Sequence, residues 1–270
     1  MILLEMLSYP FLVRAFLVGV LVSLCAALLG TSLVLKRYSM IGDGLSHVGF
    51  GALAIASALG VAPLAVAVPV VVVAAVLLLR VSQSGRVRGD AVIALISSGA
   101  LAVGVLVISL TSGVNTNVSN YMFGSILTIS GSDAVLSVIL CAAVLVVFTL
   151  FYPRIFAVTF DETFARATGT KAEGYNMLLA ILTAITVVLG MRMMGALLIS
   201  SLIIFPALSA MRVFRSFRSV TVCSAVLSVV CFTLGMTLSY ALETPSGASV
   251  VAVNIIAFAL FALAGRLLRR

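Results

Sequence analysis

Apolar runs long enough to cross a lipid bilayer recur from one end of this 270-residue chain to the other. Inside hydrocarbon every backbone N–H and C=O group must be bonded within the protein, so only helices and closed barrels can span it. A barrel shows short segments of alternating hydropathy, whereas the runs here are continuous. With 63% of residues apolar and 9% charged, the sequence predicts an all-α polytopic integral membrane protein with a single transmembrane domain over residues 1–270.

Polar breaks between the runs indicate about nine spans, or eight to nine if one of them does not cross fully. The expected spans are residues 11–35, a second span that follows Gly42-Asp43-Gly44 and runs to about Gly60, and residues 63–79, 91–110, 134–152, 177–190, 194–211, 220–240 and 248–264. The span at 177–190 is short, so we expect it to be tilted or incomplete. Residues 121–127 are too few to cross and fit a re-entrant or interfacial segment.

Basic residues fall almost entirely on one side of this arrangement. If the loops after the odd-numbered spans face the cytoplasm, they hold all of the 16 Lys and Arg residues except Arg14 and Arg192. The positive-inside rule then places the N-terminus outside and the C-terminus in the cytoplasm. The net charge of +8 is therefore an orientation signal, and no nucleic-acid partner is expected.

One ionisable pair lies at the start of the second span. His47, the only histidine, follows Asp43, one of eight carboxylates, by four residues. Positions i and i+4 share one face of a helix, so carboxylate and imidazole can bind a divalent transition metal together. The alternative is that Asp43 caps the helix and His47 is an interior hydrogen-bonded residue. Small residues such as Gly49 and Gly51 predict a helix inside the bundle.

Two ligand groups are too few for a closed transition-metal site. A metal waypoint on an ion path therefore requires a second copy of the chain across a two-fold axis, or further ligands from neighbouring spans. Candidate pathway-lining residues are Ser46 beside the pair and Ser200, Ser201 and Pro206 in the seventh span, where proline frees a backbone carbonyl.

The largest polar insert, about residues 154–176, predicts a short helix that begins after the cap Asp161 and stops at Gly169. Phe160 and Phe164 would share one face of it. Two turns cannot cross a bilayer, so we expect a docking element along the cytoplasmic membrane surface; an ordinary amphipathic interfacial helix is the alternative. No Walker A motif occurs in the chain, and we expect a transporter subunit without its own ATPase site rather than an enzyme.

Several stretches together resemble the permease subunit of bacterial ABC importers for zinc and manganese. They are residues 37–47 (Arg-Tyr-Ser-Met-Ile-Gly-Asp-Gly-Leu-Ser-His), 121–127 (Tyr-Met-Phe-Gly-Ser-Ile-Leu), Phe160-Asp161 with Ala165 and Gly169, 194–200 continuing through Pro206-Ala207, and 245–248 (Pro-Ser-Gly-Ala), in the family's order and spacing. The resemblance implies a homodimer of permeases in the bacterial cytoplasmic membrane, with two cytoplasmic ATPase subunits and an extracytoplasmic metal-binding protein.

The resemblance also implies roles for particular residues. Asp43 and His47 would form the ion-pathway pair, and Phe160 to Gly169, with Phe164 and Ala165, would be the coupling helix that sits in a cleft of the ATPase. Zn²⁺ or Mn²⁺, possibly Fe²⁺, would be the transported substrate, with no permanently bound cofactor. Two alternatives remain: an ABC permease for a metal chelate, for which a longer chain is expected, and an ATP-independent cation carrier, which needs more mid-membrane carboxylates than Asp43.

Overall fold

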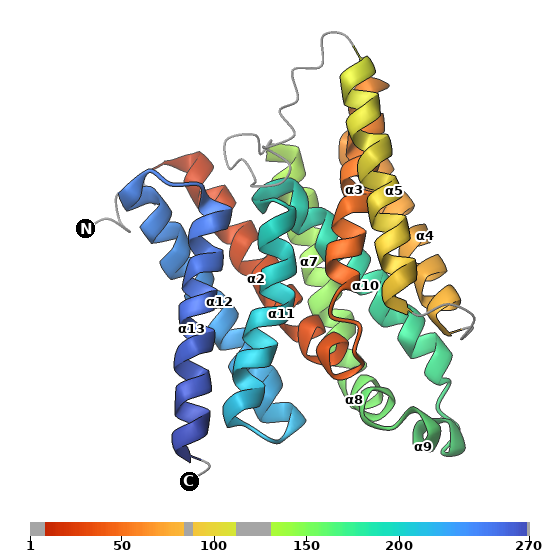
Figure 1. Cartoon of the computed structure of the whole chain (residues 1–270), viewed down its shortest axis with the longest axis vertical. Helices are drawn as coiled ribbons and strands as arrows, with labels where there is room; N and C mark the ends of the chain where they lie inside the picture. Colours follow the sequence, from red (N-terminus) through yellow and green to blue (C-terminus); the bar gives the residue numbers. More distant parts are fainter. Residues whose placement is uncertain (1–8, 84–88, 112–130, 269–270) are drawn as a thin grey trace.

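The computed structural model describes residues 9–83, 89–111 and 131–268, and all regular structure within them is helical (Figure 1). The helices are α2 (Pro10–Leu35), α3 (Ile41–Ala58), α4 (Pro63–Gln83), α5 (Gly89–Leu110), α7 (Gly131–Leu150), α8 (Tyr152–Phe160), α9 (Glu162–Ala167), α10 (Ala172–Met194), α11 (Ala196–Val213), α12 (Phe217–Leu242) and α13 (Ser246–Leu268). Eight of them, α2, α4, α5, α7 and α10 to α13, are long and apolar enough to cross a membrane. The prediction of an all-α polytopic membrane protein is confirmed.

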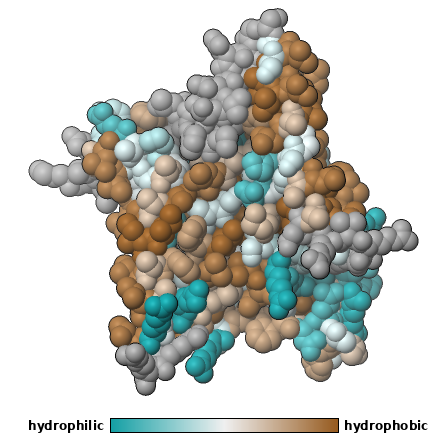
Figure 2. Space-filling view, in the orientation of Figure 1, coloured by the Kyte–Doolittle hydropathy of each residue, from teal (hydrophilic) through white to brown (hydrophobic). Residues whose placement is uncertain are grey.

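The helices surround a central group. In the apolar stretch of α10, 72% of the residues are buried inside the bundle, whereas the value is 22% in α5 and in α13. Accordingly, α10 and α2 run through the middle of the bundle, while α13 and the α4–α5 pair lie at its opposite edges (Figure 1). Apolar residues cover most of the face shown in Figure 2, and hydrophilic residues gather near its lower end, where α8, α9 and the end of α13 lie.

Helix α3 packs through its small residues, as the sequence predicts. A methyl group added to Gly51 would lie 2.8 Å from the carbonyl oxygen of Ala100 in α5, and one on Gly49 would lie 2.9 Å from the methyl carbon of Met191 in α10. Small residues allow helix backbones to approach this closely in a membrane protein. The backbone of α3 therefore sits between α5 and α10, in the interior of the bundle.

Two predicted boundaries are wrong. Helix α3 begins at Ile41, so Gly42-Asp43-Gly44 forms its first turn and does not precede it. With 18 residues it is not among the eight candidate spans, because Asp43 and His47 lower its hydropathy. Helix α10 has 23 residues and is not short, because helical hydrogen bonding continues beyond the apolar part into polar residues at its start.

The predicted re-entrant segment, residues 121–127, lies outside the described residues.

Helix α8 is an element that the sequence reasoning missed. It follows α7 after one residue and has proline in its first turn, a position where the missing N–H costs nothing. Its rings pack on the start of α12: the ring centroids of Tyr152 and Phe156 lie 5.6 Å and 5.1 Å from that of Phe217. These contacts hold α8, and α9 after it, against the lower end of the bundle (Figure 1).

Candidate functional site

Asp43 and His47 lie on successive turns at the start of α3. Asp43 Oδ2 is 3.8 Å from His47 Nε2, and the two side chains are 41% and 21% exposed. Asp43 does not cap the helix, because the cap position is Met40 and no side chain bonds there. Two ligand atoms on one tetrahedral ion lie about 3.4 Å apart. A small side-chain rotation would therefore let this pair hold one ion between carboxylate and imidazole.

The pair faces a recess of 310 Å³ between α3 and α5. Its lining residues are Met40, Asp43, His47, Ile93, Ala94, Ser97, Ser98 and Leu101. The sequence reasoning missed Ser97 and Ser98, whose only signal is a pair of hydroxyls in an apolar run. Their hydroxyls add polar atoms to the α5 side of the recess, where the other lining residues are apolar.

Along the length of the helices, the pair lies level with the middle of α11. A methyl group on Gly42 would lie 2.7 Å from the Cδ1 atom of Ile203, so the start of α3 is beside the middle of α11. At about 1.5 Å per residue, α11 extends roughly 10 Å from Ile203 towards Ala196 and roughly 15 Å towards Val213. An ionisable pair at such a depth is unfavourable in a membrane unless it faces a polar path or a partner.

Of the four pathway-lining candidates, the structure brings Ser200 to the pair. Its hydroxyl lies 3.3 Å from Asp43 Oδ1 and also 3.1 Å from the carbonyl oxygen of Ala196. Ser46 is fully buried and donates to the Asp43 carbonyl oxygen at 2.7 Å. Ser201 donates to its own helix, and Pro206 is buried. None of the four candidates is among the residues that line the recess itself, and Ser200 alone contacts a side chain of the pair, that of Asp43.

One copy of the chain offers an incomplete metal site. Within residues 9–83, 89–111 and 131–268, no three His, Cys, Asp or Glu side chains come together in a way that could hold a metal ion. The polar side chains that line this recess are those of Asp43, His47, Ser97 and Ser98, and the Ser200 hydroxyl contacts Asp43 from α11. The arrangement can therefore receive a divalent cation only weakly unless other ligands reach it.

The helix expected in the polar insert is α9, with both of its predicted ends. Asp161 accepts a hydrogen bond from the Phe164 N–H at 2.9 Å. After the helix, Gly169 takes a φ of 85°, its N–H donates to the Arg166 carbonyl, and the Thr170 N–H donates to that of Ala165. This is a Schellman motif, in which glycine adopts the left-handed conformation without steric cost. Both ends of α9 are thus defined by short-range contacts.

Two faces of α9 differ in character. Ala165 is 1% exposed and packs against Val158 of α8 and Ala172 of α10. Phe164, and Phe160 at the end of α8, are each 65% exposed. Neighbouring phenyl rings exposed in this way at one end of a bundle are typical of a surface that another protein or a membrane covers.

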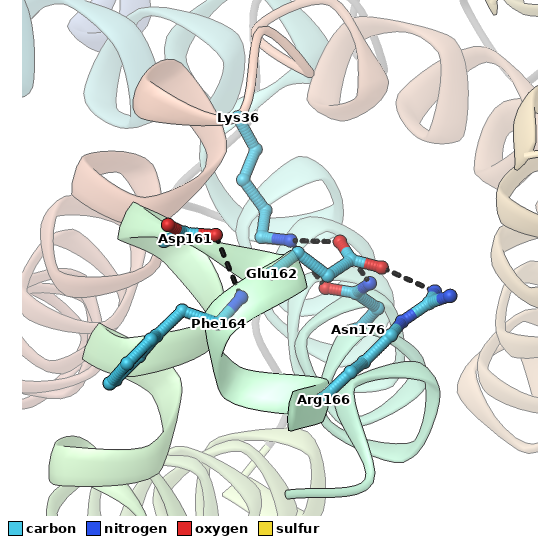
Figure 3. A network of polar contacts seen from close by, with 6 residues as sticks. All are labelled: Lys36, Asp161, Glu162, Phe164, Arg166 and Asn176. Carbon is cyan, nitrogen blue, oxygen red and sulfur yellow. Dashed lines mark hydrogen bonds and ion pairs between the residues drawn. The ribbon is translucent and has the colours of Figure 1, made fainter. Parts of the chain in front are cut away.

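A polar network joins α9 to the end of α2 and the start of α10 (Figure 3). The Lys36 amino group donates to Glu162 Oε2 at 3.1 Å and to Asn176 Oδ1 at 2.6 Å, while Asn176 Nδ2 donates to Glu162 Oε2 at 3.0 Å. Arg166 donates to the other carboxylate oxygen, Oε1, at 2.6 Å. Burial raises the pKa of Glu162, but hydrogen bonds from Asn176 and Lys36, the charge of Lys36 and the bond from Arg166 outweigh it and hold that pKa below its usual value.

A helical bundle with eight helices long and apolar enough to cross a membrane, and with an ionisable pair that faces a recess between two of its helices, has the architecture of a polytopic integral membrane protein. The model of the ABC 3 transport family matches residues 8–265, and the chain belongs to this family.

Relatives within this class match nearly the whole chain. The high-affinity zinc uptake system membrane protein ZnuB of Haemophilus influenzae is 29% identical over 252 residues, which cover 93% of this chain and 97% of that protein. The manganese transport system membrane protein MntC of Halalkalibacterium halodurans is 28% identical, with 96% and 88% covered. A chain in the solved structure of PsaBC from Streptococcus pneumoniae in complex with Fab has a TM-score of 0.85 and 25% identity, with 96% and 95% covered.

Proposed function

We propose that this chain is the permease subunit of an ABC importer that moves Zn²⁺ or Mn²⁺ into the cytoplasm, driven by ATP hydrolysis in partner subunits. The observation that carries the proposal is the Asp43–His47 pair, which faces a recess deep in a bundle whose relatives are named for zinc uptake and manganese transport. Carboxylate and imidazole together suit both ions, and also Fe²⁺. The metal passes through as substrate and is not a resident cofactor.

The incomplete site supports a homodimer. Two copies related by a two-fold axis present the same surface to each other, so two recesses can face one passage. They would supply two carboxylates and two imidazoles, enough for four-coordination. Each copy, residues 1–270, acts as one transmembrane domain. A site shared between copies also opens when they move apart, which releases the ion.

The position of α9 supports the assignment of partners and orientation. The exposed rings of Phe160 and Phe164 fit a cleft of a cytoplasmic ATPase subunit, one for each copy of the permease. In the proposed orientation α8, α9 and the C-terminal end of α13 lie at the cytoplasmic face of the bacterial inner membrane, and the N-terminus is outside. An extracytoplasmic metal-binding protein delivers the ion to the opposite face.

The complex of this permease with its ATPase subunits, reconstituted in liposomes, is expected to take up Zn²⁺ or Mn²⁺ only when ATP is present on the ATPase side. With the metal-binding protein added, the metal should also stimulate ATP hydrolysis several-fold. Isotope uptake and phosphate release measure the two activities. Uptake driven by an ion gradient without ATP would support the cation carrier, and uptake of metal only as a chelate would support the chelate permease.

Replacing Phe164 by aspartate is expected to separate the permease from its ATPase. Burying a phenyl ring contributes about 1.5–3 kcal/mol, so its loss with an added charge should weaken binding by about a hundredfold. Co-purification and binding of the isolated ATPase measure this. Phe164→Leu keeps an apolar side chain and should lose less. Equal binding by Phe164→Asp and the unmodified chain would remove this ring from the interface.

A further inference from the structure

The Lys36–Glu162–Asn176 network connects segments that are far apart in the sequence. The Lys36 side chain is 9% exposed and Asn176 is 4% exposed, although both are polar. Burying an ammonium group is unfavourable unless it is paired and hydrogen-bonded. Figure 3 shows the Lys36 chain reaching the Glu162 carboxylate, with the Asn176 amide on the same carboxylate. The three groups satisfy one another.

Lys36 belongs to a turn that ends α2 and leads directly into α3. It is the cap residue of α2, and Arg37 after it has a φ of 62°. The Arg37 N–H donates to the Val34 carbonyl, and the Tyr38 N–H donates to that of Leu33 at 2.8 Å. This is again a Schellman motif, here with arginine in a conformation that costs a non-glycine residue free energy. Helix α3 begins at Ile41, so the turn is short and held by its own bonds.

The apolar contacts of α9 are with α8 and with the start of α10, at the end of α10 far from its contact with Gly49 of α3. Ala165 joins α9 to α8 and α10 through Val158 and Ala172. Glu162 is the residue of α9 that bonds to the end of α2. The direct route from α9 to the start of α3 therefore runs through the carboxylate of Glu162, the amino group of Lys36 and the bonded turn. Asp43 and His47 occupy the first two turns of the helix that follows.

We propose that Lys36, Glu162 and Asn176 are positioning residues that transmit movement of α9 to the start of α3 and so set the position of Asp43 and His47. This inference rests on the proposed function, in which α9 follows the ATPase. None of the three residues touches the ion. Asn176 holds the carboxylate and the amino group together and ties both to α10.

The test uses Lys36→Met and Glu162→Gln in the complete complex. Because Phe160 and Phe164 are unchanged, the ATPase should remain bound and hydrolyse ATP within about twofold of the unmodified rate, while metal uptake falls about tenfold, which is the usual size of a coupling effect. The double variant should show no further loss, since the two changes break one linkage. The number of ions taken up per ATP hydrolysed is the measured quantity.

Arg154→Gln is the matched control. It removes an exposed basic side chain of α8 that donates to the Tyr175 hydroxyl at 2.7 Å, next to Asn176 in sequence, but does not reach Glu162. Its ratio of uptake to hydrolysis should be unchanged. Unchanged ratios in Lys36→Met and Glu162→Gln would overturn the proposal. A parallel fall of uptake and hydrolysis, or loss of the ATPase subunit, would also overturn it by making the network a folding or docking element.

Failure of the proposed function is distinguishable, because the unmodified complex would then take up no metal with ATP. The linkage is tested independently of transport by the distance between spin labels at Met40→Cys and Thr168→Cys. With the linkage intact α9 and the start of α3 move together, so added ATP should leave this distance nearly unchanged in the unmodified background and change it in Glu162→Gln. The same change in both backgrounds would contradict the linkage.

Discussion

Replacing Asp43 or His47 by alanine is expected to reduce ATP-driven uptake of Zn²⁺ or Mn²⁺ about a hundredfold or more. Loss of groups that only support metal ligands already costs 10- to about 100-fold, and either change here removes one of the two ligand groups in each copy. Size-exclusion chromatography should show an assembled complex, because both side chains are partly exposed in the recess. Initial rates of isotope uptake in liposomes check the prediction.

Glu173→Ala is the matched control for the carboxylate. Glu173 also lies in the first turn of a helix, α10, but is exposed at the water-facing end of the bundle and lines no part of the recess. Uptake by this variant should equal that of the unmodified complex. Normal uptake by both Asp43→Ala and His47→Ala would remove the pair from the transport mechanism.

Replacing Gly30 by valine is expected to destabilise the bundle strongly and to lower the yield of folded protein. Even a single carbon added at Gly30 would overlap the backbone carbonyl oxygen of Ile203 in α11. A backbone atom cannot rotate away as a side chain can, so α2 and α11 must separate. Overpacking typically costs about 1–3 kcal/mol, a large part of a total stability of about 5–15 kcal/mol. Yield from membranes and the melting temperature in detergent measure the effect.

The same substitution is expected to disturb the site, because Ile203 also faces Gly42, next to Asp43. Any protein that folds should therefore transport metal poorly. Gly99→Ala is the control: it adds a carbon in the middle of α5, where nothing lies within 4 Å. It should keep the normal yield and melting temperature. A Gly30→Val protein as stable as Gly99→Ala would contradict the packing of α2 against α11.

Features that depend on neighbouring residues could be predicted from the sequence. The apolar runs determine helices because an unpaired backbone group in hydrocarbon is too costly. The ends of α9 follow from Asp161 and Gly169, which satisfy groups of their own helix. The spacing of Asp43 and His47 places them on one face of any helix. Each of these results needs no knowledge of the rest of the chain.

Features that depend on distant segments appeared only in the tertiary structure. The hydroxyls of Ser97 and Ser98 face the recess, while Ser46, beside Asp43, faces the packed side. The pattern of polar residues does not tell which serine reaches the pair, because that depends on how each helix is rotated and which neighbour it meets.

The sequence alone determined that this protein is a bundle of membrane helices with one carboxylate–imidazole pair and a capped surface helix, because hydropathy, helical spacing and capping act over a few residues. Only the tertiary structure decided the depth of the pair beside α11 and the contact of Lys36 with Glu162, 126 residues further along the chain. Contacts over such separations result from close packing of whole helices, where glycines such as Gly30 and Gly51 set the approach.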